Sequence, residues 1–442
     1  MTLSLPDYVA AYLNKFSQQE YEIGWQNKFG INNVIVIPAI AEFENIKVLF
    51  SSLLQNDPTY FESTLVLFVI NNSAVSSDEV KEDNQKSLDC LRSIIFNNTN
   101  AKFANEVKQS GLSVGLIDAA SKGNELDEKH SGVGLARKIG MDLALTVFNY
   151  TDKSKKVIIC LDSDCTVKQN YLTTIVSDFN KQNYSAAVIE YAHNINGSDK
   201  ESSAIIPYEI FLRYYVMGLK YAGSEYAFHT IGSTTVCDVA AYIKTGGMNK
   251  RKAAEDFYFL EKIAKNYTIG KINSTKVYPS NRSSWRVPFG TGQRVARFLK
   301  NTHNEYQLFD PAVFEILKYW LQLFNSNVSS DPEYILSCSK EIHIELYNFL
   351  VNQNYLEQWK KIFENAKSKK QLSHQKKIWF DAFKTLKLIH YLRDTAFPNI
   401  NMFDALDMIF IKLEINNTIN RNSKDIPELE IQKQYLCLLR EI

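Results

Sequence analysis

Two pairs of acidic residues could each bring two carboxylates to one point. The first pair belongs to Asp162-Ser163-Asp164, which directly follows the apolar run 157–161. In an extended chain, Asp162 and Asp164 point to the same side and can hold one hard cation, Mn²⁺ or Mg²⁺, together with substrate phosphate oxygens. A turn-forming Asp after a strand is the simpler interpretation. We predict Asp162 and Asp164 as metal ligands, and Asp162 and Ser163 as residues that bind a phosphate-bearing ligand.

The second pair is Glu255-Asp256, which follows a glycine turn at 246–247 and opens a helix expected over 257–265. Acidic residues at a helix start are favoured by the helix dipole, and this purely structural role is one interpretation. The other is general base catalysis, in which a carboxylate removes the proton of a hydroxyl group. We predict Asp256, with Glu255 beside it, as the catalytic pair.

Cations follow small residues at the start of the helix expected over 134–147. Gly132 precedes this helix, and Arg137 and Lys138 lie in its first turns. Backbone amides and cations at a helix start suit a phosphate group, although the spacing is not that of a P-loop. We predict these three residues as phosphate-binding, and a simple helix-entry turn is the alternative.

A second basic segment combines Arg282 and Arg286 with a glycine-rich stretch and then Gln293 and Arg294. It is typical either of a mobile lid that binds anions or of a linker between domains. We predict these four residues as ligand-binding. His229 is a further candidate metal ligand, with a hydrogen-bonded structural histidine as its alternative.

Strands alternating with helices must position these residues. Five short apolar runs predict strands, and they cover 34–37, 65–70, 114–118, 157–161 and 188–191. Helical periodicity between them predicts an α/β fold with a mostly parallel sheet, in which ligands bind beyond the carboxyl ends of the strands.

The character of the chain changes after residue 300. Five segments with helical periodicity and no convincing strand follow, at 310–326, 331–351, 354–366, 374–395 and 401–415. We therefore expect two domains: an α/β domain over 1–300, with a helical preamble at 1–30, and an all-α domain over 301–442.

Composition excludes several classes of protein. The 50 basic and 49 acidic residues leave a net charge of +1, so the chain lacks the excess of positive charge that is typical of nucleic-acid-binding proteins. The six cysteines form no CxxC pair, which argues against a zinc site or a disulfide framework. No apolar run is long enough to span a bilayer and no signal peptide is evident. We expect a cytoplasmic protein, and peripheral membrane contact and a homodimer remain open.

Taken in order, these motifs resemble the family 2 glycosyltransferases of GT-A fold. The match runs over about residues 30 to 300, from Val34-Ile-Val-Ile-Pro38 through Asp162-Ser-Asp164 to Glu255-Asp256. The resemblance implies a hexosyltransferase-like enzyme that uses a UDP- or GDP-sugar donor, an unidentified hydroxyl acceptor and Mn²⁺ or Mg²⁺. It implies that Asp162 and Asp164 form the DxD motif, and that Asp256 is the base of an inverting reaction.

The same resemblance implies a nucleotide-binding role for the loops after the first two strands. Pro38, Ala39 and Glu42 lie where the nucleobase binds, and Asn72 replaces an Asp that commonly faces the nucleoside. The stretch from Gln293 is similar to the Q-x-x-R-W element of processive synthases, but the membrane helices of those enzymes are missing.

Two other functions stay open. A catalytically degenerate nucleotide-sugar-binding or scaffold protein would keep the fold without the reaction. A sugar nucleotidyltransferase would need a glycine-rich basic loop after the first strand, whereas 38–42 is acidic and lacks glycine.

Overall fold

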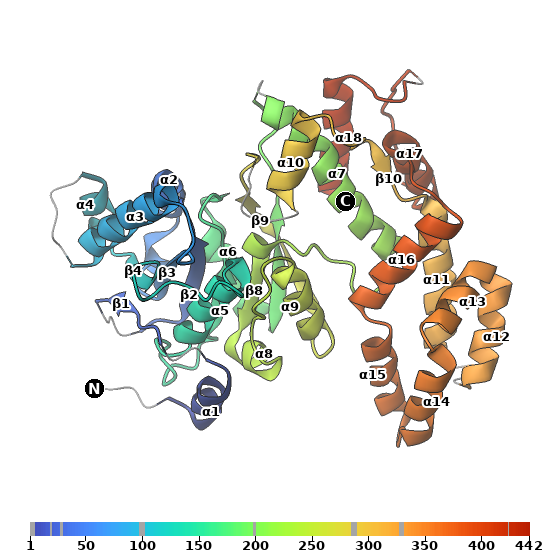
Figure 1. The fold of residues 1–442 in the computed structure, drawn as a ribbon, viewed down its shortest axis with the longest axis horizontal. Helices are drawn as coiled ribbons and strands as arrows, with labels where there is room; N and C mark the ends of the chain where they lie inside the picture. The colour runs from blue at the N-terminus through green and yellow to red at the C-terminus, as the bar shows by residue number, and fades with distance from the viewer. Residues whose placement is uncertain are drawn as a thin grey trace. The chain divides into compact units, whose positions relative to one another are not determined.

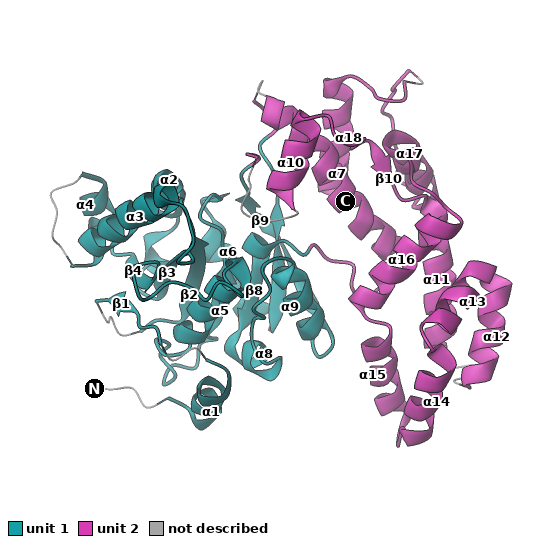
Figure 2. Ribbon diagram, viewed as in Figure 1, with its two compact units in different colours: residues 1–194, 230–280, 286–289 teal, residues 195–229, 281–285, 290–442 magenta. Residues whose placement is uncertain are grey.

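The computed structural model describes residues 5–17, 20–26, 30–96, 102–197, 200–283, 290–326, 331–422 and 424–442. The chain forms two compact units (Figure 2). The first contains the chain up to Asn194 and the segment Thr230–Ser280. The second contains Ile195–His229, residues 281–283 and the chain from Gly290 onward.

A mostly parallel sheet forms the centre of the first unit (Figure 1). Its strands, in the described part of the chain, are β1 Gly24–Trp25, β2 Asn33–Ala39, β3 Thr64–Asn71, β4 Ser113–Ala119, β5 Val157–Cys160, β6 Thr166–Val167, β7 Ala186–Tyr191, β8 Thr235–Asp238 and β9 Ile269–Tyr278. Their order is β1-β4-β3-β2-β5-β8-β7-β9-β6. Strands β4, β3, β2 and β5 are parallel, whereas β8 runs antiparallel to both its neighbours.

The central strands are apolar on both faces because helices cover both faces. In β2, Ile35 and Ile37 pack into one core, while Val34 and Val36 pack into another on the opposite face. The helices of this unit are α1 Asp7–Phe16, α2 Phe43–Leu53, α3 Asp78–Phe96, α4 Lys102–Gln109, α5 Val133–Ala144, α6 Tyr171–Lys181, α8 Val239–Lys244 and α9 Glu255–Ala264. Helices α2, α3 and α6 contribute to the first core, and α5 and α9 to the second.

Helices dominate the second unit (Figure 1). They are α7 Lys200–Tyr221, α10 Thr291–Leu299, α11 Pro311–Asn325, α12 Pro332–Ile342, α13 Ile344–Asn352, α14 Tyr355–Asn365, α15 Lys369–Trp379, α16 Ala382–Thr395, α17 Met402–Lys412 and α18 Leu429–Glu441, with a small β10–β11 ladder of Gln307–Leu308 and Ile400–Asn401. Trp320, Phe324 and Trp359 lie at its core, almost fully buried.

The predicted α/β class is confirmed. Each of the five expected strands corresponds to a strand of the sheet (β2, β3, β4, β5 and β7), and its ends lie within two residues of the observed ends. The helix expected over 331–351 is two helices, because His343 adopts an extended conformation between them and accepts a hydrogen bond from the Glu345 amide. The helix expected over 374–395 is also two, since Asp381 caps the start of α16.

The compact units do not divide the chain at residue 300. Helix α7 belongs to the helical unit because Ile206, Ile210 and Tyr214 pack into the core of that unit. Its Glu209 carboxylate, which is fully buried, also accepts hydrogen bonds from Arg440 of α18 at 2.7 and 2.8 Å. Whether domains end at residue 300 stays a prediction.

Candidate functional site

Helix α5 packs closely against β2 and against the loop before α9, because glycines lie at the points of contact. A Cβ atom on Gly134 would lie 2.2 Å from the Arg251 carbonyl oxygen, and one on Gly140 would lie 2.4 Å from Cγ1 of Val36. Only glycine fits at both positions. Gly134 and Gly140 therefore have a packing role, because they let α5 approach the loop before α9 and strand β2. A Cβ atom on Gly132, the glycine predicted to bind phosphate, would lie 2.9 Å from the Lys252 Cα atom.

Arg137 projects from α5 and joins the two acidic motifs. Its Nη2 donates to Asp162 Oδ1 at 2.5 Å, and its Nη1 donates to Glu255 Oε1. The Arg137 side chain is 1% exposed. Burial alone would lower the pKa of Arg137, but Asp162 and Glu255 raise it above its ordinary value, so the guanidinium stays charged. Two motifs that are 93 residues apart in the sequence thus meet at one cation.

The Asp162-Ser163-Asp164 triplet is a turn. The Cys165 amide donates to the Asp162 carbonyl at 3.2 Å, which closes the turn directly after β5. The extended geometry that we expected for the triplet is therefore wrong, because a chain reversal between β5 and β6 replaces it. Ser163 is buried, whereas Asp162 and Asp164 are each partly exposed.

Asp256 lies in the first turn of α9, next to the buried Glu255. The preceding residue, Ala254, has a left-handed conformation with φ 57°, which is strained for a residue with a Cβ. Asn249 holds the turn by donating to the Glu255 carbonyl at 2.8 Å. Burial, and then the neighbouring Glu255 charge, raise the pKa of Asp256 to about 7, while Arg137 opposes this rise. A carboxyl group with a pKa in this range can accept a proton near neutral pH.

Asp162 and Asp164 are a partial ligand set for a cation. No group of three or more His, Cys, Asp or Glu side chains in the described residues is arranged to hold a metal. Mg²⁺ and Mn²⁺ commonly bind one or two carboxylates and take their other ligands from water and substrate phosphate. Two partly exposed carboxylates at a strand end fit this pattern, although Arg137 already engages one oxygen of Asp162.

The buried side-chain amide of Asn84 links the loops after β2 and β3 by hydrogen bonds. Asn84 of α3 accepts from the Ala41 amide at 2.9 Å and donates to Asn72 Oδ1 at 2.7 Å. The Asn72 amide in turn donates to the Ser73 and Ala120 carbonyls. Asn72 is 1% exposed, so its first role is to join these loops. Asn84 was not predicted as a site residue, because a single polar residue within an amphipathic helix gives no signal of such a role.

The other residues predicted at this end of the sheet are also buried. Pro38 lies in β2 beyond the stretch that pairs with β5, where a strand tolerates a missing amide proton. Ala39 ends the same strand, and Glu42 is buried at the start of α2, where its carboxylate accepts from the Asn45 amide group. These residues shape the loop that we predict to surround the nucleobase.

Lys138 does not accompany Arg137 in the site. Its ammonium pairs with Asp142 at 2.8 Å and is 5% exposed. The Asp142 carboxylate also accepts from Tyr12 at 2.8 Å and from Tyr242 at 2.6 Å. This buried network links α1, α5 and α8, which does not favour Lys138 as a phosphate ligand. The aromatic periodicity of the N-terminal helix was the signal for Tyr12, and no signal pointed to Asp142.

The remaining candidates belong to the second unit, except Arg286, which lies outside the described residues. His229 and Arg282 are partly exposed, as is Gln293. Arg294 donates to Glu305 at 2.5 Å, and Arg297 pairs with the same carboxylate at 3.0 Å. Because Glu305 is 5% exposed, these pairs hold α10 against the following loop.

Within the described part of the chain, every helix is too short or too polar to span a bilayer.

No family model matches the sequence, and no curated protein matches it. Among solved structures, S. aureus TarS 1-349 in complex with UDP-GlcNAc matches with 13% identity and a TM-score of 0.37, covering 75% of this chain and 92% of that chain. The mannosyltransferase PcManGT from Pyrobaculum calidifontis, in complex with GDP-Man and Mn²⁺, matches with 11% identity and a TM-score of 0.37, covering 98% of this chain and 91% of that chain. Identities and TM-scores this low assign no activity to the chain.

Proposed function

We propose that this chain is a glycosyltransferase of the family 2, GT-A type, which transfers a sugar from a nucleotide-diphosphate-sugar to an acceptor hydroxyl. One observation carries the proposal: Asp162 and Glu255 both pair with the buried guanidinium of Arg137. If Asp162 only formed a turn and Glu255 only stabilised a helix start, neither role would require the two carboxylates to share one buried cation. A site for a cation, a diphosphate and a base needs carboxylates from both loops at one place.

The proposed donor site lies at the end of β5. Asp162 and Asp164 would hold Mn²⁺ or Mg²⁺ against the diphosphate, and Pro38, Ala39 and Glu42 would surround the nucleobase. The cation, when bound, supplies positive charge that stabilises the departing nucleotide diphosphate. Arg137 keeps Asp162 in place, because a buried, doubly paired arginine leaves that carboxylate little freedom to rotate.

Asp256 is the proposed base of an inverting reaction. Its carboxylate takes the proton of the acceptor hydroxyl as that oxygen forms a bond to the anomeric carbon. The bond from the anomeric carbon to the diphosphate oxygen breaks, and the nucleotide diphosphate leaves with the electron pair. The raised pKa of Asp256 suits this role, since a base works best when its pKa lies near the working pH.

The other predicted ligand contacts stay part of the proposal. Asn72 and Ser163 would contact the nucleotide, and Arg282, Arg286, Gln293 and Arg294 its anionic groups. His229 would be an additional metal ligand. We further propose that the protein acts in the cytoplasm. The proposed domains are an α/β domain over 1–300 and a helical domain over 301–442.

A panel of UDP-, GDP- and dTDP-sugars, each with and without Mn²⁺, tests the proposal. Binding to the folded state raises the melting temperature by mass action, and slow release of nucleotide diphosphate reports hydrolysis of the donor. We expect one nucleotide class to stabilise the chain only with Mn²⁺, and Asp164→Asn to abolish that dependence. Binding without any hydrolysis or transfer would identify a degenerate scaffold protein instead. The absence of a shift with every donor would refute the proposal.

A further inference from the structure

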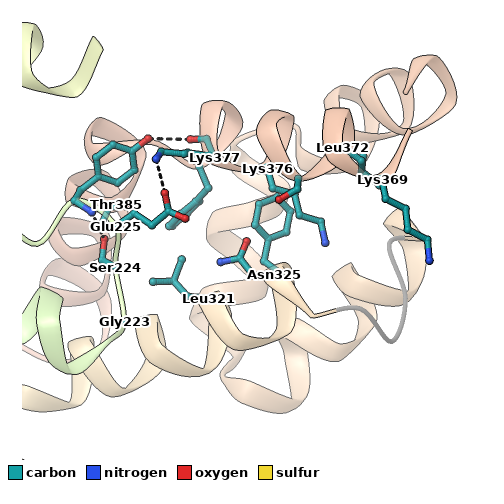
Figure 3. Close-up of a pocket in the computed structure, with 14 residues that line it drawn as sticks. Gly223, Ser224, Glu225, Leu321, Asn325, Lys369, Leu372, Lys376, Lys377 and Thr385 are labelled. Carbon is teal, nitrogen blue, oxygen red and sulfur yellow. Dashed lines mark hydrogen bonds and ion pairs between the residues drawn. The ribbon is translucent and has the colours of Figure 1, made fainter. Parts of the chain in front are cut away.

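A pocket of about 280 Å³ lies wholly within the second unit, between α11, α15 and the turn after α7 (Figure 3). Its charged lining residues are Lys369, Lys376, Lys377 and Glu225. Lys377 and Glu225 neutralise each other in an ion pair of 2.5 Å. The lining therefore keeps two positive charges that no acidic lining residue balances.

Lys376 is the unusual member of this set. It is 7% exposed, yet among the described residues its ammonium has one hydrogen bond, a long contact of 3.4 Å to the Ser326 carbonyl. An ammonium group has three donors, so at least two have no acceptor in the part of the chain that the structure describes. Burial lowers the pKa of Lys376, because removal from water disfavours the charged form.

A buried charge whose hydrogen bonds are incomplete destabilises the fold. If position 376 served only to fill space, methionine would pack there equally well, because it has a similar length and no charge. An anion that enters the pocket would complete the hydrogen bonds of Lys376 and balance its charge.

Aromatic rings form the apolar part of the same pocket. Phe324, Phe380 and Tyr226 line it, and the Lys376 ammonium lies 5.7 Å from the Phe324 ring centroid. Asn325, which is exposed, adds an amide group to the lining. Rings beside a cation suit a ligand with an anionic group and a flat or apolar part.

We propose that this pocket binds a small organic anion, with a phosphate or carboxylate group on Lys376 and Lys369 and an apolar part against Phe324 and Phe380. The volume limits the ligand to a molecule smaller than a nucleotide-sugar. The proposal does not depend on the transferase activity, because every residue that it uses belongs to the helical unit.

Calorimetric titration of the full chain with phenyl phosphate, benzoate and neutral benzyl alcohol tests the proposal. We expect saturable binding of at least one of the two anions, and binding of benzyl alcohol at least ten-fold weaker. Tighter binding of phenyl phosphate identifies a phosphate site, and tighter binding of benzoate identifies a carboxylate site. Inorganic phosphate, which lacks the apolar part, should bind more weakly than phenyl phosphate.

Two variants of Lys376 and one control variant assign any binding to this pocket. Lys376→Met should weaken anion binding at least ten-fold without lowering the melting temperature, and Lys376→Arg should restore most of it. Lys370→Met removes the same charge from α15 outside the pocket lining and should leave binding unchanged. Equal affinity in wild type and Lys376→Met, equal affinity for benzyl alcohol, or no saturable anion binding would overturn the proposal.

Discussion

Arg137→Met should destabilise the first unit strongly, because it removes the cation between two carboxylates and keeps most of the side-chain volume. Removing one partner of a buried ion pair typically costs about 3–5 kcal/mol, since the other charge stays buried and unpaired. Most of this loss of stability comes from Glu255, because its side chain is 6% exposed and water cannot replace its lost partner. Asp162 is 35% exposed, so water can replace part of its lost contact. We therefore expect one such penalty of about 3–5 kcal/mol rather than two.

Hydrogen exchange of the α5 and α9 amides is the suitable assay, because it reports the opening of this unit separately from the helical unit. Arg92→Met is the matched control. Arg92 pairs with Asp118 at 2.7 Å but is 42% exposed, so its loss should cost less than about 1 kcal/mol. The double variant Arg137→Met/Glu255→Gln removes the buried uncompensated charge and should recover at least half of the lost stability.

Two results would refute this reasoning. A cost for Arg137→Met no larger than that of Arg92→Met would show that the ion pairs do not hold the two loops together. A double variant no more stable than Arg137→Met would show that the penalty comes from lost packing and not from the unpaired Glu255.

Three further predictions concern the same unit. Because burial and Glu255 raise the pKa of Asp256 to about 7, turnover should rise with pH and level off above about pH 7, and a flat pH–rate profile would contradict this. Gly134→Ala places a methyl group 2.2 Å from the Arg251 carbonyl and should lower stability by about 1–3 kcal/mol in a thermal melt, whereas an unchanged melt would argue against the close approach of α5. Tyr12→Phe removes one hydrogen bond to Asp142 and should cost about 1 kcal/mol while leaving donor affinity unchanged; a changed affinity would link this network to the site.

Raising the pH should itself weaken the first unit through Asp256. A carboxyl group with a raised pKa in the folded state holds its proton there when the unfolded chain has lost it. This contribution to stability is present below about pH 4 and is lost as the pH rises to about 7. The difference between 3.8 and about 7 corresponds to at most about 4 kcal/mol. Asp256→Asn should remove this part of the pH dependence, as measured by hydrogen exchange of α9.

The central strands were predictable because their burial leaves a strong sequence signal. Strands β2, β3 and β5 are apolar on both faces, so they appear as continuous apolar runs bounded by turn residues. Strand β8 was not predictable. It has four residues, and its antiparallel position between β5 and β7 depends on pairing with segments that are distant in the sequence.

The two acidic motifs were also predictable, but their relationship was not. A pair of carboxylates after a buried strand is visible in the sequence. Which carboxylates pair with Arg137 depends on the orientation of α5 about its own axis. That orientation follows from close contacts at Gly134 and Gly140, which no local pattern reveals. Helix α7 was missed because its polar residues do not form a clear stripe, and a helix of that kind is typical of a buried position.

The measurement that tests the central claim most directly compares wild type with Asp256→Asn for both donor affinity and turnover. We predict that the donor affinity of Asp256→Asn stays within a factor of about three of the wild-type value, since Asp256 does not hold the donor. Its turnover should be lower by about 10²–10⁴-fold, since base catalysis is lost. Glu255→Gln is the control for the neighbouring position and should act mainly on stability through Arg137. Near-normal turnover of Asp256→Asn at unchanged affinity would contradict the account.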